Sequence, residues 1–589
     1  MISYFFVVLQ FKIFIMKTFL KNILSSFFAM ILIFVSFIIF IVLLIPEKKS
    51  IIVLDNSVLK IDFNQPILDR TSENPFDEIN IMDFSEEGSL EFKDILDNIE
   101  KAKNDDKIKG IYLNFSSINA GFSQIEEIRK KLLEFKDIGK FIYSYADSYS
   151  QNAYYLASIS DKIALNPEGI IDLKGLSAGV MFYKGLMDKL GIEVQIIRHG
   201  KFKAAVEPYM YNSMSNENRQ QIHQLLNSIS SNMIDGIASS RGISSKEIDY
   251  MINNMDLSSA KKCLERKIID DIAYEDQILE ELKDVSENEI TFLDYMKVKN
   301  PKISVSNNKI AIIYATGAIN TGKGSYNAIG SETTVKAIRK ASKDENVKAI
   351  VLRINSPGGS ALASEIIWRE IDLVKLKKKV VVSMGDYAAS GGYYIACNSH
   401  KIFANHSTIT GSIGVFGVVP NNQRFLNQKL GVYIDTVNTH KHSDIANGYR
   451  KLSESEISVI QNSVEDIYNT FISHVSEGRG INIDQVDKIG QGRVWSGKDA
   501  LSIGLIDEIG GLEDAILSAA ELAELDDYRI ITLPKKTDVF EELVESFSAK
   551  ERVILPDFLG ISEKTINQLE FLNTKETIQA RIPFIFEVN

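Results

Sequence analysis

The most apolar stretch of the chain is residues 23–45, which read ILSSFFAMILIFVSFIIFIVLLI and carry no charge over 23 residues. About 20 apolar residues are enough for a helix to cross the ~30 Å hydrocarbon core of a bilayer, so the pattern predicts one transmembrane helix. A cleaved signal peptide is the alternative, but the IPEKKS that follows lacks a small-residue cleavage pattern and favours an uncleaved signal anchor. Lysines precede the span and mixed charges follow it, which favours a cytoplasmic N-terminus with the main body outside.

Beyond the span, short apolar runs alternate with segments of helical periodicity. KAIVLRI and KKVVVSM are typical of buried strands, whereas SETTVKAIRKASKDE has the spacing of an amphipathic helix. Strands that alternate with helices build βαβ units, in which parallel strands are covered on both faces. The pattern therefore predicts the α/β fold class.

The α/β part of the sequence contains a tandem duplication. Five segments recur in the same order at a spacing of about 240 residues, which is hard to obtain by chance. The pairs are LKIDFNQPILD (59–69) with IAIIYATGAIN (310–320), DKIKGIYLNFSS (106–117) with ENVKAIVLRINS (345–356), DSYSQNAYYLA (147–157) with DYAASGGYYIA (386–396), KIALN (162–166) with KIFAN (401–405), and SSAKKCLERKIIDDI (258–272) with SGKDALSIGLIDEI (496–509).

These patterns divide the 589 residues into five parts, since a single core rarely grows beyond ~300 residues. The predicted parts are a cytoplasmic N-terminus (1–22), a transmembrane signal anchor (23–45), a first repeat (51–295), a second repeat (305–535) and a C-terminal appendage (536–589).

Composition excludes several classes of function. A formal net charge of -12 argues against nucleic-acid partners, which require a basic surface. The two cysteines, Cys263 and Cys397, lie far apart and outside any Cys/His cluster, so they predict neither a zinc site nor a disulfide framework. They are better interpreted as small buried side chains. We expect no metal and no cofactor.

The two repeats differ at a few positions whose residue types could take part in catalysis. The second repeat has NSPGG (355–359) where the first has SSINA (116–120), and Ser390 stands where the first has Gln151. Paired glycines after a strand can present backbone N–H groups to an oxyanion, and a serine at a helix start can act as a nucleophile. A plain tight turn and an N-cap serine are the structural alternatives.

A serine nucleophile needs a group that accepts its proton. Among the seven histidines, His400 and His406 follow Ser390 most closely, but no histidine lies in a motif of a Ser-His-Asp triad. Lys203 precedes the small apolar run AAV, where burial would lower the pKa of its ammonium; its counterpart in the second repeat is Ser443. A solvated lysine is the alternative.

Four motifs in order, GKFKAAVEPYM, NSPGGSA, MGDYAASGGYYIA and TGSIGVFG, resemble signal peptide peptidase A, also called protease IV, in its long form with two fused repeats behind a membrane anchor. The resemblance runs from the anchor to about residue 530, and NSPGG and ASGG also resemble the Clp protease subunit and the crotonase superfamily. It implies a Ser/Lys dyad with Ser390 as nucleophile and Lys203 as base, an oxyanion hole from the N–H groups of Gly359 and Gly391, and Ser412 orienting the lysine.

The resemblance also implies a substrate, a location and an assembly. It implies a homotetramer in the bacterial inner membrane whose catalytic part, on the periplasmic side, degrades signal peptides left in the bilayer. Whether the dyad forms within one chain or between two stays open. A crotonase-type acyl-CoA isomerase or hydratase and a non-catalytic membrane scaffold are the rival interpretations.

Overall fold

The computed structural model describes residues 21, 25–30, 32–33, 36, 51–72, 88–299, 306–325, 327–536 and 578–581. The chain divides into two compact units, residues 1–52 and 53–589, and the elements named below all lie in the second. Among the described residues, no helix is both long and apolar enough to span a bilayer. Most of the predicted span, residues 23–45, lies outside the described residues.

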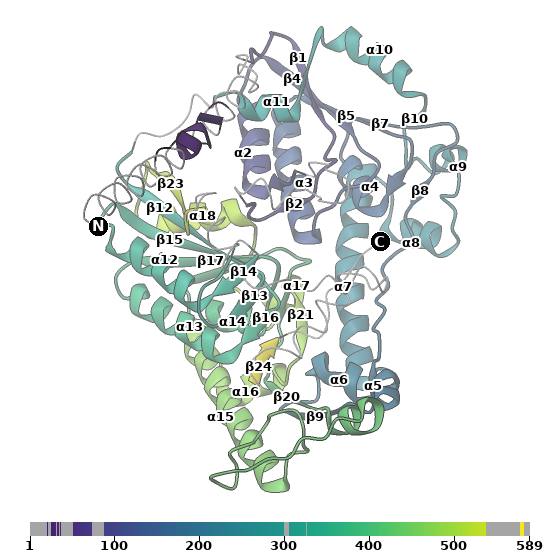
Figure 1. The fold of residues 1–589 in the computed structure, drawn as a ribbon. Coiled ribbons are helices and arrows are strands. Elements are labelled where there is room, and N and C mark those ends of the chain that lie inside the picture. The colour runs from purple at the N-terminus through teal and green to yellow at the C-terminus, as the bar shows by residue number, and fades with distance from the viewer. Residues whose placement is uncertain are drawn as a thin grey trace, which may run out of the picture. The chain divides into compact units, whose positions relative to one another are not determined.

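The duplicated halves fold into matching series of elements (Figure 1). In the first half the elements are β1 (Ser57–Ile61), β2 (Ile67–Leu68), β3 (Leu90–Glu91), α2 (Phe92–Lys103), β4 (Ile108–Asn114), α3 (Phe122–Asp137), β5 (Phe141–Ala146), β6 (Tyr149–Ser150), α4 (Gln151–Ala157), β7 (Lys162–Leu165), β8 (Ile171–Asp172), α5 (Lys184–Leu190), β9 (Glu193–Arg198), η1 (Ala204–Val206), α6 (Glu207–Met210), α7 (Asn216–Arg241), α8 (Ser245–Asn253), α9 (Ala260–Glu265), β10 (Asp271–Ile272), α10 (Glu275–Val285), β11 (Asn288–Thr291) and α11 (Phe292–Lys297).

The second half repeats most of this order, with additional strands that include β16, β21 and, from the C-terminal region, β24. Its elements are β12 (Lys309–Thr316), β13 (Ala318–Asn320), β14 (Ala328–Gly330), α12 (Ser331–Lys343), β15 (Val347–Ser356), β16 (Gly358–Ser360), α13 (Ala361–Lys375), β17 (Lys379–Ala389), α14 (Gly391–Ala396), β18 (Lys401–Ala404), β19 (Ile409–Gly411), β20 (Phe416–Asn421), η2 (Phe425–Leu430), α15 (Glu454–Arg479), α16 (Ile483–Ile489), β21 (Val494–Ser496), α17 (Gly497–Ser502), β22 (Glu508–Ile509), α18 (Leu512–Leu522), β23 (Arg529–Leu533) and β24 (Ile578–Arg581).

Each repeat is built on a parallel sheet. The first has six strands in the order β10-β7-β5-β4-β1-β11, and every pairing in it is parallel. The second has eight strands, six of them in the order β21-β19-β17-β15-β12-β23. Only its β19–β21 pairing is antiparallel. The predicted α/β class with parallel strands is therefore confirmed.

Alternate side chains of the second sheet pack against different helices. Ile310 and Ile312 of β12 share a core with α18, whereas Ala311 and Ile313 share one with α12, α13 and α15. Figure 1 shows α18 on one face of this sheet and α12 and α13 on the other. Covering both faces explains why the strands are apolar at nearly every position.

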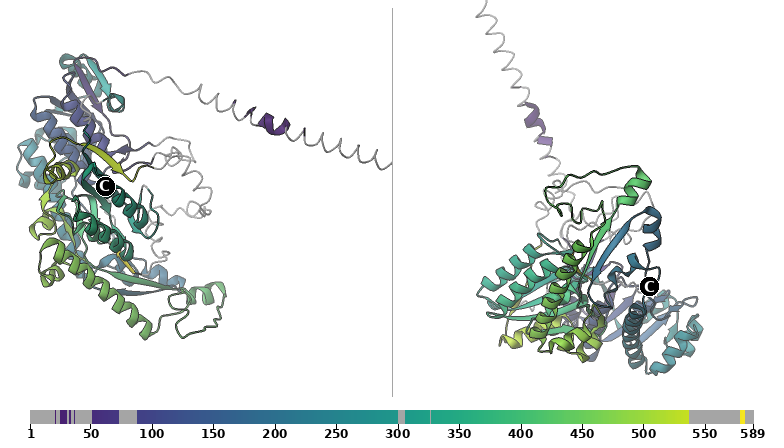
Figure 2. Two further views of the ribbon diagram at one scale, coloured as in Figure 1. Left: turned by 90° about the vertical axis from the view of Figure 1, so that its left-hand side faces the viewer. Right: turned by 90° about the horizontal axis from the view of Figure 1, so that it is seen from below.

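A third sheet joins the repeats, in the order β14-β13-β16-β24-β20-β9. Strand β9 comes from the first repeat and pairs antiparallel with β20 of the second. Beyond β20, η2 and the segment that follows extend away from the second repeat's main sheet (green in Figures 1 and 2). Strand β24 belongs to the predicted C-terminal appendage, yet it lies inside this sheet.

Candidate active site

Ser390 lies where β17 ends and α14 begins, as its sequence pattern predicted. Its backbone has φ of 55° and ψ of −113°, which are strained values for a residue with a side chain. Such conformations cost about 1–3 kcal/mol and persist where surrounding contacts enforce them. Here the Ser390 N–H donates to Gly411 O at 2.8 Å, and Ser390 O accepts from Tyr394 N–H at 2.8 Å. The strained turn directs the hydroxyl toward the first repeat.

Lys203, from the first repeat, meets Ser390 within the same chain. Its Nζ donates to Ser390 Oγ at 2.8 Å and to Ser412 at 3.1 Å, both to the hydroxyl and to the carbonyl oxygen. The lysine is 0% exposed, and this burial lowers the pKa of its ammonium well below the usual 10.5. The structure therefore contradicts the solvated-lysine alternative at Lys203.

The segment that carries Lys203 is held by elements of both repeats. Gln221 of α7 donates to Phe202 O at 3.0 Å and accepts from Val494 N–H of β21 at 3.3 Å. Gly492 has φ of 82°, and an added Cβ there would lie 2.6 Å from Lys203. A glycine at this position lets the chain of the second repeat pass directly against the lysine.

Gly359 and Gly391 are neighbours in space beside Ser390. An ideal Cβ on Gly391 would lie 3.2 Å from Gly359 N, and one on Gly358 would lie 2.8 Å from Gly391 N. Gly358 also has φ of 96°, a conformation that disfavours other residues. The NSPGG stretch thus forms strand β16 and brings its backbone against the start of α14.

A strand from the C-terminal region lies across these glycines. Strand β24 is antiparallel to β16, with Ala580 opposite Gly359, and antiparallel to β20, with Gln579 opposite Phe416. The Ala580 carbonyl oxygen is so close that an added Cβ on Gly391 would lie 3.2 Å from it. The gap between β16 and β20 therefore accommodates an extended peptide backbone next to Ser390.

The histidine alternative finds no support in the geometry. His400 Nδ1 accepts from Val380 N–H at 3.1 Å, and His406 Nδ1 lies 4.0 Å from Glu126. In the part of the chain that the structure describes, Lys203 is the side chain that contacts Ser390 Oγ. Within the same described residues, no group of three or more His, Cys, Asp or Glu side chains could hold a metal ion. Cys263 and Cys397 are buried free thiols, as predicted.

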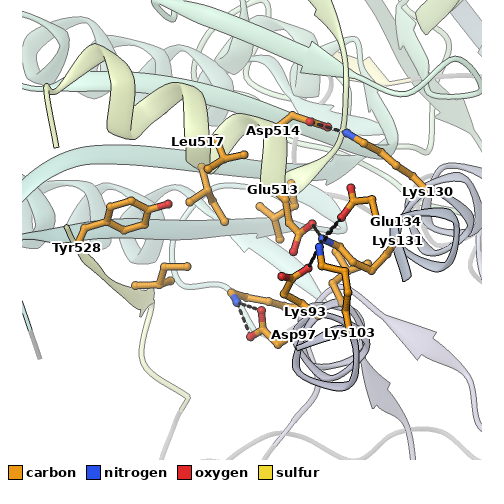
Figure 3. Close-up of a pocket in the computed structure, with 15 residues that line it drawn as sticks. Lys93, Asp97, Lys103, Lys130, Lys131, Glu134, Glu513, Asp514, Leu517 and Tyr528 are labelled. Atoms are coloured by element: carbon orange, nitrogen blue, oxygen red, sulfur yellow. Dashed lines mark hydrogen bonds and ion pairs between the residues drawn. The ribbon is translucent and has the colours of Figure 1, made fainter. Parts of the chain in front are cut away.

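A pocket of about 350 Å³ lies between the repeats, lined by α2, α3 and α18. Figure 3 shows its lysines facing carboxylates: Lys131 Nζ is 2.8 Å from Glu134 and 2.5 Å from Glu513, and Lys130 Nζ is 2.6 Å from Asp514. The pairs with Glu513 and Asp514 join the repeats, whereas the Lys131–Glu134 pair lies within α3, and none of the residues that line the pocket belongs to the Ser390–Lys203 pair.

Sequence reasoning missed a buried polar network between the repeats. Arg353 of β15 is 0% exposed, and it donates to Asp69 at 2.8 Å and to Glu127 at 3.0 Å. Asn355 of NSPGG also donates to Asp69. The available signal was an arginine in the middle of the apolar run KAIVLRI, because buried charges require partners.

Two segments of the chain match the model of one protein family, described as Peptidase family S49. The matched residues are 134–289 and 372–526, one segment in each predicted repeat. The chain belongs to this family, and it is a serine-type peptidase with two family repeats. The resemblance drawn from the four motifs is thereby confirmed.

Curated relatives match over most of the chain. Protease 4 from Salmonella typhi is 36% identical over 79% of this chain and 77% of its own length. Protease 4 from Haemophilus influenzae is 36% identical over 73% and 72%. The chloroplastic serine protease SPPA of Arabidopsis thaliana is 33% identical over 84% and 74%. The solved structure of a mutant ClpP1 from Listeria monocytogenes is 18% identical over 35% of this chain and 94% of its own, with a TM-score of 0.25.

Proposed function

We propose that the protein is a membrane-anchored serine endopeptidase in which Ser390 is the nucleophile and Lys203 the general base. The observation that carries this proposal is the 2.8 Å contact between Lys203 Nζ and Ser390 Oγ at a lysine with no exposed surface. Burial lowers the pKa of the Lys203 ammonium well below its usual value, which favours the neutral amine that can accept a proton. Ser412 orients the amine through its hydroxyl and carbonyl oxygens.

The chemical steps follow from this arrangement. Lys203 accepts the Ser390 proton while the serine oxygen attacks a peptide carbonyl, and the oxyanion is bound by the N–H groups of Gly359 and Gly391. Lys203 then protonates the leaving amine. Water, activated by the neutral lysine, hydrolyses the acyl-enzyme and regenerates the serine. The protein's own groups supply every proton transfer, and we propose no cofactor.

The substrate is proposed to be an extended apolar peptide, specifically a signal peptide left in the membrane after secretion. The position of β24 between β16 and β20 supports binding of an extended backbone next to Ser390. Main-chain hydrogen bonds to two strands give affinity for peptides of varied sequence. The names of the relatives, Protease 4 and serine protease SPPA, are consistent with this role.

The location is proposed from the N-terminal sequence. The charge-free residues 23–45 support a single transmembrane anchor, with the catalytic unit on the periplasmic side of a bacterial inner membrane. An anchored enzyme shares two-dimensional space with membrane-bound peptides, which raises their effective concentration. A ClpP/crotonase-like fold and assembly as a homotetramer remain parts of the proposal that rest on the motif resemblance.

The test is cleavage of a fluorogenic apolar peptide by the detergent-solubilised full chain. We expect Ser390→Ala and Lys203→Ala each to lower kcat by a factor of at least about 10³ without changing the thermal unfolding temperature, because each removes one member of the dyad. Lys201→Ala is the matched control: this lysine is exposed, two positions from Lys203, so its loss should leave kcat unchanged. Full activity in Lys203→Ala would refute the assigned base.

A further inference from the structure

The N-cap residue of helix α3 in the first repeat has no side chain to cap the helix, and Gln124 of the same helix accepts only the N–H of that residue, at 3.1 Å. Its N-cap is Gly121, whose φ of −72° and ψ of 159° resemble those of Ser215, which caps α7 with its hydroxyl. At α3 the carboxylate of Asp386, from the second repeat, acts as the cap instead of an N-cap side chain. It accepts the Ser123 N–H at Oδ1, at 2.9 Å. A Cβ on Gly121 would lie 2.0 Å from the Asp386 carboxyl carbon. Space for the carboxylate, rather than backbone conformation, therefore requires glycine here.

Asp386 lies on β17, four positions before Ser390. There the pairing of β15 with β17 shifts register, between Ile354 and Ser356, and the side chain of Asn355 bridges the irregularity. Asn355 accepts from Tyr387 N–H at 3.1 Å and donates to Asp69 at 2.5 Å and to Asp386 at 3.5 Å. Because β15 leads to the β16 glycines and β17 leads to Ser390, this cluster lies at the base of both.

The capped helix is also connected to the segment that carries Lys203. Arg129 of α3 donates to Gly236 O at 2.8 Å and to Ser240 Oγ at 2.6 Å, both on α7. Helix α7 in turn holds the Lys203 segment through the bond from Gln221 to Phe202 O. Asp386 is therefore one point where the strand that leads to Ser390 is attached to the helix pair that supports the Lys203 segment.

We infer that Asp386 is a positioning residue for Ser390: by capping α3 across the repeat boundary, its carboxylate fixes the nucleophile strand relative to the repeat that supplies Lys203. A charged cap is suited to this role, because a carboxylate at a helix N-terminus accepts N–H groups and interacts favourably with the helix dipole. Small misplacements of reacting groups cost up to ~10²-fold in rate, so loosening this contact should lower kcat more than substrate affinity. The inference rests on the proposed dyad.

Protonation of Asp386 gives the contact a pH dependence. Burial, followed by the nearby Asp69 carboxylate, raises the pKa of Asp386 to about 6. The positive charge of Arg353 lowers this pKa but does not offset the increase. The other charged groups of the described network are Glu126 and Glu127 of α3. Above its pKa the carboxylate accepts the α3 N–H groups, and below it one oxygen is protonated and the cap weakens. Activity should thus fall below pH 6 more steeply than protonation of Lys203 alone requires.

The experiment compares four variants of the full-length enzyme by kcat, KM, pH profile and thermal unfolding. Asp386→Ala should lower kcat by roughly 10- to 100-fold with little change in KM. Asp386→Asn keeps one acceptor oxygen but no charge, as the protonated carboxyl does, so its kcat should lie between those of Asp386→Ala and wild type and should lack the extra steepness at acidic pH. Asp147→Ala, at the exposed first-repeat counterpart of Asp386, should match wild type.

The decisive variant is the double substitution Gly121→Ser with Asp386→Ala. Without the carboxylate, the introduced serine has room to cap α3 from within the first repeat, so the unfolding temperature should recover while kcat stays low. Recovery of both would reduce Asp386 to a helix cap and overturn the inference, as would wild-type kcat in Asp386→Ala. If Asp386→Ala fails to fold, the double variant and Asp386→Asn still decide the question. Activity in Lys203→Ala would instead refute the dyad itself.

Discussion

The two repeats share a scaffold but use equivalent positions differently. Ser390 contacts Lys203, whereas its counterpart Gln151 is buried and accepts a bond from Gly175 N–H at 3.0 Å. Lys203 is fully buried, whereas its counterpart Ser443 is exposed and forms a local bond with a neighbouring threonine. The first repeat has thus kept the fold and carries Lys203, the proposed base, whereas the second carries Ser390, the proposed nucleophile, and the glycines.

The same division extends to the residues that join the repeats. Asp386 caps a helix of the other repeat, whereas Asp147 accepts from Tyr145 and Asn166 within its own. Arg353 pairs with two carboxylates of the first repeat, while Asn114 at the equivalent position bonds Glu275 locally. Both second-repeat residues therefore bond the other repeat, whereas both first-repeat counterparts bond within their own.

The largest effect on this difference between the repeats is expected when Lys203 of the first repeat is replaced by a side chain that stays charged. Lys203→Arg keeps a cation that does not lose its proton, so we expect kcat to fall by about 10² to 10⁴. In the wild type, kcat/KM should rise with pH as the ammonium deprotonates, with a midpoint well below 10.5 because burial lowers the Lys203 pKa. Rates of peptide cleavage across pH measure both. A Lys203→Arg enzyme with the wild-type pH profile would contradict the assignment.

The contribution of the second repeat can be tested at Gly391, one of its two proposed oxyanion donors. Gly391→Pro removes one backbone N–H at the first position of α14, where helices accept proline. We expect kcat to fall by about 10² to 10³ with KM nearly constant. Asn152→Pro, in the first turn of the equivalent first-repeat helix α4, is the matched control and should retain activity. Equal losses in both variants would point to a general folding defect.

The smallest effect is expected where the second repeat has a strand that the first lacks. Ala580→Pro removes the backbone N–H of β24 opposite Gly359 and weakens that pairing by about 1 kcal/mol. If substrate binds in the same gap, KM for a peptide should fall by a factor of ~2–10 while kcat is unchanged. Steady-state kinetics with one fluorogenic peptide tests this. An increase in KM would mean that β24 helps to build the binding site.

Sequence alone determined the α/β class, the duplication, the family and the residues of the candidate site, because each left a local signal. Apolar runs mark buried parallel strands, repeated motifs mark the second copy, and Ser390 and Lys203 lie in motifs where the aligned repeat has Gln151 and Ser443. The order of the strands was not available in this way, because the late strands β11 and β23 lie beside the first strands β1 and β12 of their sheets.

Only the tertiary structure decided how the repeats meet. That Lys203 and Ser390 come together in one chain depends on packing between residues 187 positions apart. Gly121 carries no sign in the sequence that the Asp386 carboxylate fills the space beside it, and β24 looked like an appendage because its partners β16 and β20 belong to another part of the chain. Such contacts depend on complementary shapes and charges across an interface, which local patterns of polarity do not encode.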